Sequence, residues 1–530
     1  MRRSLVLSLL MSLLVWVGLP EVASGQEILQ HKRILYVPLD NRPVCLDYVV
    51  DTFKTVPVQL AVAPREYLSY QSVPGDTEAI WQWLREQASS TDVMVIAADS
   101  LVYGGLVPSR RHEIGPDVLN ERVDRFRELK EVNPALQIYL FTTIMRTPRA
   151  ASGGTEPDYY EIWGPQIFRL TQLLDLQDQG LLTPENESEL NALVKVIPEK
   201  VKFDWFDRRT ANRRVNERWI ASAKEGLIDY LVLCRDDSAQ LSQSQREWRY
   251  LKPQTANLSP TRFHAFPGTD EVGMVLMTRA VNDLTFKTPQ IGVVYAPGVG
   301  GATVASYEDQ PVQDNIAAHI YALGGFPAIQ LDTADLILLV NTPEDGRTLE
   351  ASHTSNQEAS SNGAREIVRQ AVRWSKLGKT VAIGDIAYGN GADRSLMYVL
   401  EDRNLLYDID AYAGWNTAGN SLGYAMSQGL LAPRYFTKET KDRLLTVRYL
   451  DDWGYQAVVR NKVNQKVIYP SQINGAALGS SYDYVQAWIE LEMKDFAKKH
   501  LGKNGELLFG IRLPWMRMFE IEPLLKAQKK

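Results

Sequence analysis

The chain has 530 residues, of which 45% are hydrophobic and 23% are charged, and its formal net charge is -6. A chain of this length is too long for one simple hydrophobic core. It therefore predicts two or three domains, or one barrel with insertions. The mild acidity argues against nucleic acid or an anionic membrane surface as the main partner.

The N-terminus has the pattern of a secretory signal peptide over residues 1–25. Arg2 and Arg3 form a positively charged n-region, and an apolar run extends from Leu5 to Leu19. Small residues at 23–25 form a cleavage site. The apolar run is short for a membrane span, and no later segment is longer and equally apolar. We therefore expect a mature protein that is secreted or periplasmic and has no membrane span.

The sequence contains two cysteines, Cys45 and Cys234. Cys234 lies in an apolar strand pattern, which favours a buried free thiol, with a disulfide to Cys45 as the alternative. The six histidines are scattered and form no compact metal-binding motif, so a zinc enzyme is not expected. The sequence predicts no cofactor.

Along the chain, apolar runs that predict buried strands are each followed by a polar cluster. Amphipathic helix patterns, such as 118–132 and 160–174, fill the intervals and indicate a parallel sheet of the α/β class. The expected strands are 33–40, 91–98, 136–143, 230–234, 262–266, 335–340, 379–383 and 407–412.

Residues 290–330 interrupt this alternation with a short strand, a Gly-rich loop at 297–302 and a helix, and they are interpreted as an inserted small α/β unit. Without them, eight strand–helix units remain within 26–431, and eight is the number that closes a parallel (β/α)8 barrel. Residues 432–530 look mainly helical and are expected to form a cap. The Gly-rich loop lacks the residues of a phosphate-binding loop, so a plain turn is preferred.

Ligands of parallel α/β folds bind at the carboxyl ends of the strands. Each polar residue at such an end also has a structural explanation, because Asp, Asn and Gly start helices and form turns. Their joint occurrence predicts one polar binding site at the mouth of the barrel, and this site suits a neutral, polyhydroxylated saccharide. The substrate-binding candidates are Asp40, Arg42, Asp99, Tyr103, Arg146, Asn341, Asp385, Tyr388, Asn390, Trp415 and Asn416.

Two pairs of adjacent acids are the catalytic candidates: Asp236 with Asp237, and Asp270 with Glu271. Cleavage of a glycosidic bond needs one acid to protonate the leaving oxygen and a second group to stabilise or attack the anomeric carbon. Asp236 and Asp237 follow the fourth expected strand, which resembles the acid pair of hexosaminidase-type barrels. That resemblance implies that Asp236 orients an acetamido group and that Asp237 is the general acid.

Other chemistries have weaker support. Ser100 and Ser238 lack a nucleophile-elbow motif, and His264 on the fifth expected strand suits a core histidine better than a base. The carboxylates are also suitable ligands for Ca²⁺ or Mg²⁺, which remains an alternative.

Several longer motifs resemble a bacterial family known as a domain of unknown function. They are VPLDNRP at 37–43, SLVYGGL at 100–106, RDD at 235–237, PGTDE at 267–271, DIAYGNG at 385–391, GWNT at 414–417 and DDWGY at 451–455. The resemblance spans nearly the whole mature chain but implies no activity.

The sequence thus predicts an exported glycoside hydrolase that acts on an amino sugar or a related saccharide. Two alternatives remain open: a non-catalytic periplasmic saccharide-binding protein, and a metal-dependent hydrolase built from flavodoxin-like domains.

Overall fold

The computed structural model describes residues 25–149 and 154–527. Most of the expected signal peptide, residues 1–24, lies outside the described residues. In the described part of the chain, no helix has both the length and the apolar character needed to span a bilayer.

The protein has the α/β fold that the sequence predicts, with two parallel sheets. The first has the order β2-β1-β3-β4-β5-β6 and the second the order β13-β11-β9-β7-β8. The strands of the first sheet are β1 (Arg33–Val37), β2 (Gln59–Val62), β3 (Val93–Ala97), β4 (Gln137–Ile144), β5 (Tyr230–Arg235) and β6 (Phe263–Pro267). Those of the second are β7 (Gln290–Tyr295), β8 (Phe326–Pro327), β9 (Leu336–Asn341), β11 (Thr380–Asp385) and β13 (Ala411–Ala413).

All eight expected strands are present, but the prediction that they close into one barrel is wrong. Five lie in the first sheet and three in the second, and β6 does not pair with β7. Each sheet has the order 2-1-3-4-5 of doubly wound, flavodoxin-like sheets, with a sixth strand added to the first. Residues 290–330 supply β7 and β8, so they begin the second sheet.

Two helices explain why the sheets remain open. In α12 (Val272–Leu284) and α16 (Ala418–Tyr435), nearly every residue is buried. A helix that is buried on all sides does not have the position of an outer barrel helix, which keeps one face in water. Instead, α12 contacts the first sheet, α16 contacts the second, and the two helices pack together. The result is one hydrophobic core that extends across both sheets.

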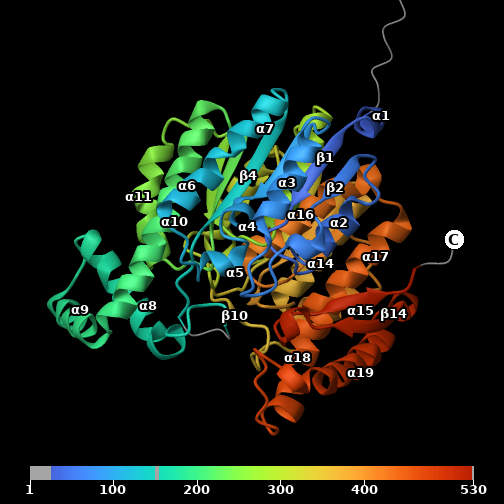
Figure 1. Ribbon diagram of the computed structural model, residues 1–530. Coiled ribbons are helices and arrows are strands. Elements are labelled where there is room, and N and C mark those ends of the chain that lie inside the picture. The colour runs from blue at the N-terminus through green and yellow to red at the C-terminus, as the bar shows by residue number, and fades with distance from the viewer. Residues whose placement is uncertain (1–24, 150–153, 528–530) are drawn as a thin grey trace, which may run out of the picture.

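Two further parts adjoin this double-sheet body, and the C-terminal one shares its hydrophobic core. The helices α8 (Tyr160–Asp178) and α9 (Pro184–Val196) project from one side, as Figure 1 shows, and they have a small core of their own with part of α10 (Glu199–Glu225). The C-terminal region contains α17 (Lys438–Arg448), α18 (Arg460–Val463) and α19 (Tyr482–His500). It also contains an antiparallel pair, β14 (Leu508–Arg512) with β15 (Glu522–Leu525).

Both cysteines are buried and unpaired. This confirms the free thiol that the sequence favours at Cys234.

Candidate functional site

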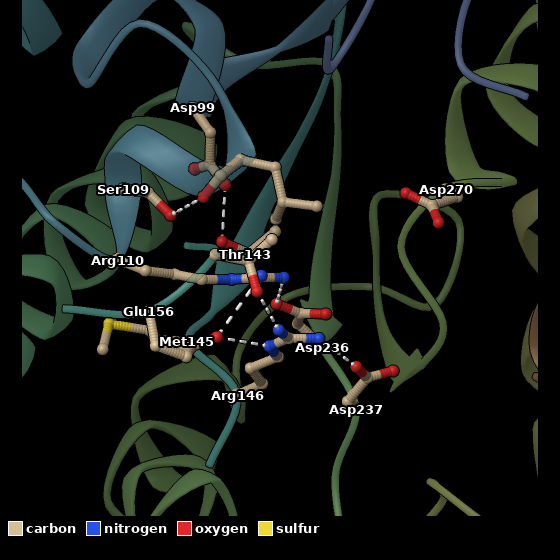
Figure 2. A network of polar contacts seen from close by, with 12 residues as sticks. Asp99, Ser109, Arg110, Thr143, Met145, Arg146, Glu156, Asp236, Asp237 and Asp270 are labelled. Carbon is tan, nitrogen blue, oxygen red and sulfur yellow. Dashed lines mark hydrogen bonds and ion pairs between the residues drawn. The ribbon is translucent and has the colours of Figure 1, made fainter. Parts of the chain in front are cut away.

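The predicted acid pair follows β5 and lies in a network of charges (Figure 2). The Arg110 guanidinium donates to Asp236 at 2.5 Å, and that of Arg146 donates to Asp237 at 2.6 Å. Glu156 lies between the two arginines, 2.7 Å from Arg146 and 3.5 Å from Arg110. Two cations thus hold three carboxylates, and the guanidinium forks fix the directions of both aspartates.

The two aspartates differ in their access to solvent. The side chain of Asp236 is 7% exposed and that of Asp237 is 24% exposed. Burial raises the pKa of the Asp237 carboxyl, although Arg146 opposes this shift. Asp237 is therefore the more accessible member of the pair, and its raised pKa favours the protonated form.

Asp99 lies behind this network, directly after β3, and is fully buried. Thr142 and Thr143 donate their hydroxyl protons to its carboxylate. Burial nevertheless raises the pKa of Asp99 from 3.8 to about 7. It supports the site from within and does not face a substrate.

The Asp99 shift predicts a pH effect on stability. A carboxyl whose pKa is higher in the folded state favours folding below its unfolded value of 3.8, and this contribution is lost as the pH rises towards 7. The substitution Asp99→Asn should therefore increase the free energy of unfolding more at pH 8 than at pH 5. The two increases should differ by roughly 2–4 kcal/mol. Urea unfolding of both proteins at both pH values measures this. An equal effect of the substitution at the two pH values would contradict it.

A second network joins the ends of β1 and β6. Arg42 donates to Asp40 at 2.8 Å and to Asp270 at 2.5 Å, and all three side chains are buried. The Trp515 ring lies 4.8 Å from the Arg42 guanidinium, so the C-terminal segment covers this network. In Figure 2, Asp270 lies apart from Asp236 and Asp237.

Within the described residues, this second network also contains the one group with metal-ligand geometry. Asp40, Cys45 and Asp270 each present an atom, and these atoms lie within 4.8 Å of one another. The Arg42 guanidinium already bonds both carboxylates and occupies the place of a cation. A divalent ion would have to displace it, so these residues fit an arginine better than a metal.

Asp270 and Glu271 are adjacent but lie in different surroundings. Glu271 is fully buried and bonds the imidazole of His319 in α13 (Val312–Ala322) at 3.0 Å. A substrate has no access to Glu271, so the structure does not bring these two acids together as a catalytic pair.

Two candidates after the strands of the second sheet are structural. Asn341 donates to Asp385 at 2.9 Å and to Asp393 at 3.0 Å, and Tyr412 donates to Asp385. Asp385 is 1% exposed, and burial with the neighbouring charge of Asp393 raises its pKa to about 7. This network links three strand ends in the interior.

Trp415 is not an open platform for a sugar. Its side chain is 2% exposed and packs edge-on against Phe519, with ring centroids 6.1 Å apart. Stacking on a sugar needs a free ring face, which the C-terminal segment covers here.

A separate two-stranded sheet carries Glu350 in β10 (Leu349–Glu350), which pairs with β12 (Tyr388–Gly389). Asn390 donates to one Glu350 oxygen at 2.9 Å, and the Tyr307 hydroxyl donates to the other at 2.7 Å. Tyr388 lies beside them and its hydroxyl contacts Ser355. Burial raises the pKa of Tyr307, and the charges of Glu350 and Asp237 add to this shift. Tyr307 therefore lies within electrostatic reach of both carboxylates.

Four residues around this position have left-handed backbone conformations that are unusual for side chains other than glycine. Their φ angles are 33° for Asp237, 69° for Tyr307, 57° for Asn390 and 56° for Asn416. The Asn390 amide donates to the Asn416 carbonyl at 2.8 Å. Such conformations cost more energy for Asp237 and Tyr307 than for asparagine, so the surrounding contacts must hold these two residues in place.

The sequence did not point to four residues of this site: Arg110, Glu156, Tyr307 and Glu350. None of them follows a buried strand directly, which is the signal on which the prediction relied. The doubled arginine at 110–111, next to a Gly-rich turn, is the one local sign that was available. Tyr103, which the sequence placed in the mouth, instead stacks on His112 in a separate pocket.

One family model covers residues 34–523, almost the entire described chain. Its description is "protein of unknown function (DUF4127)". The protein belongs to the DUF4127 family. This confirms the resemblance that the motifs carry. No curated protein and no solved structure matches this DUF4127 chain.

Proposed function

We propose that this protein is an exported glycoside hydrolase that cleaves a glycosidic bond of an amino sugar or a related saccharide. The observation that carries the proposal is Asp237, a partly exposed acid with a raised pKa next to the buried, arginine-bound Asp236. A general acid of this kind protonates the leaving oxygen of the bond that breaks.

The roles of the remaining residues follow from their positions. Arg110 keeps Asp236 fixed, which suits a carboxylate that orients an acetamido group for attack on the anomeric carbon. Glu350, Tyr307 and Asn390 provide carboxylate, hydroxyl and amide contacts for the sugar from the loops around β10 and β12. Left-handed loop ends hold these groups in place, and this preorganisation favours catalysis.

The test is a panel of aryl glycosides offered to the purified mature protein, with N-acetylhexosaminides compared against the matching unsubstituted hexosides. We expect release of the aryl group, and faster release from the N-acetylated members. Absence of turnover across the panel, under conditions where the protein is folded, would contradict hydrolysis.

A saccharide-binding protein is the second candidate, because the sheets are open and do not form a closed barrel. A binding protein of that kind closes two lobes about a hinge. Here one hydrophobic core is continuous across both sheets, which opposes a hinge motion between them. Calorimetry with the same sugars distinguishes the two candidates, because a binding protein would retain the sugar without turnover.

A further inference from the structure

A pocket of about 450 Å³ lies on the first sheet's side, and neither acid of the pair is among its lining residues. It is formed by the loop before α3 (Thr77–Ala88), the segment after α4 (Ala98–Val102) and the end of α6 (Pro116–Asp124). Pro74, Pro108 and Ile114 give it apolar walls. Its size is that of small-molecule sites, and polar side chains share the lining with these apolar walls.

One wall of the pocket contains a pair of stacked rings. The rings of Tyr103 and His112 stack with centroids 4.8 Å apart and an interplanar angle of 25°. Burial lowers the pKa of His112 to about 4, so the imidazole is neutral. Its Nε2 bonds Asn212 and its Nδ1 accepts from the Ile114 amide, whereas the Tyr103 hydroxyl has no hydrogen-bond partner among the described residues.

Arg122 lies at another side of the pocket, and its guanidinium forms no ion pair with any described residue. Its Nη1 donates to the Val102 carbonyl at 2.7 Å, and its Nε has no hydrogen-bond partner. No carboxylate of the described chain lies within ion-pair distance of it. Burial lowers the pKa of Arg122, although the charges of Glu78 and Glu121 oppose this shift.

The acids nearest to Arg122 are engaged elsewhere. Arg125 binds Glu78 at 2.7 Å and Glu121 at 2.5 Å. Arg111, which also lines the cavity, is paired with Asp158 at 2.8 Å. Glu113 at the rim is exposed to solvent, which screens its charge. A partly buried cation left in this way is stabilised when an anion binds beside it.

We infer that this pocket binds a small carboxylate carried on a six-membered ring. Arg122 would bind the carboxylate, since a guanidinium presents parallel donors that match two carboxylate oxygens. The ring would lie at the edge of the Tyr103–His112 stack, where the Tyr103 hydroxyl offers one more hydrogen bond. This inference is independent of the proposed hydrolysis, because none of these residues belongs to the Asp236–Asp237 network.

Calorimetric titration of the full chain tests it with four probes: benzoate, glucuronate, benzamide and inorganic phosphate. We expect one of the two acids to bind saturably, benzoate if the ring is aromatic and glucuronate if it is a sugar. Benzamide and phosphate should bind at least about tenfold more weakly, because the first lacks the charge and the second lacks the ring.

Arg122→Met should weaken binding of the acid by about 10- to 100-fold, the loss expected for charge-assisted hydrogen bonds. Arg127→Met, which removes an exposed arginine paired with Glu225, is the control and should leave binding unchanged. Ile114→Trp fills the pocket without altering charge and should also abolish binding, which keeps the test valid if the Arg122 variant is unstable. Equal affinity of wild type and both pocket variants, or no saturable binding of either acid, would overturn the inference.

Discussion

Asp237→Asn is expected to lower kcat for glycoside hydrolysis by about 10²- to 10⁴-fold, the usual contribution of a general acid. The amide keeps the shape of the side chain but cannot deliver a proton to the leaving oxygen. The loss should be largest for alkyl glycosides and much smaller for dinitrophenyl glycosides, whose leaving groups depart without protonation. Steady-state kinetics on both substrate classes measures this difference.

The wild-type pH profile provides a second readout. Burial raises the pKa of Asp237, so the proton that it donates is retained to higher pH than for an ordinary aspartate, and kcat should fall as the pH rises through that pKa. This basic limb should be absent in Asp237→Asn. Asp158→Asn, which removes an exposed carboxylate paired with Arg111, is the matched control and should retain the wild-type rate and profile. Full activity of Asp237→Asn on alkyl glycosides would remove Asp237 from the mechanism.

The largest effect on stability is expected for Arg448→Met. This guanidinium is 2% exposed, lies 3.3 Å from both Asp451 and Asp452, and stacks over the Tyr48 ring at 4.2 Å. Removing one partner of a buried ion pair leaves uncompensated charge, which costs about 3–5 kcal/mol. Urea unfolding at pH 8 should show a loss of this size.

The loss should be smaller at pH 5. Burial raises the pKa of Asp451 to about 7 and that of Asp452 to about 6, so both carboxyls take up protons in the folded state as the pH falls. Lys438→Met, in the same helix α17, removes an exposed cation from its pair with Asp442 and should cost at most about 1 kcal/mol. Equal losses for the two variants would show that Arg448 does not compensate buried charge.

Most individual elements could be predicted from the sequence. Buried parallel strands are continuous apolar runs, and those ending near Asp40, Asp99 and Asp236 are visible without any tertiary information. The weaker signals were missed: β2 has only four residues, and β8 has two. The pattern in 290–330 was recognised, but its place as the start of a second sheet depended on pairing between β7 and β9.

The candidate site was predicted less completely than the strands. Position after a strand identified Asp236, Asp237 and Arg146, which the structure brings together. The same criterion also selected Glu271 and Trp415, which are buried by α13 and by the C-terminal segment. Burial of this kind depends on elements far away in the sequence, so a local motif cannot report it.

For this protein, the sequence by itself determined the α/β class, the strand positions, the DUF4127 membership and the acid pair after β5. These depend on local apolar runs and motifs. The tertiary structure was needed to show that the strands form two open sheets, because α12 and α16 are buried on all sides and each packs on one sheet and on the other helix. It also decided which acid of the pair is accessible, since the arginine that fixes Asp236 lies 126 positions away in the chain.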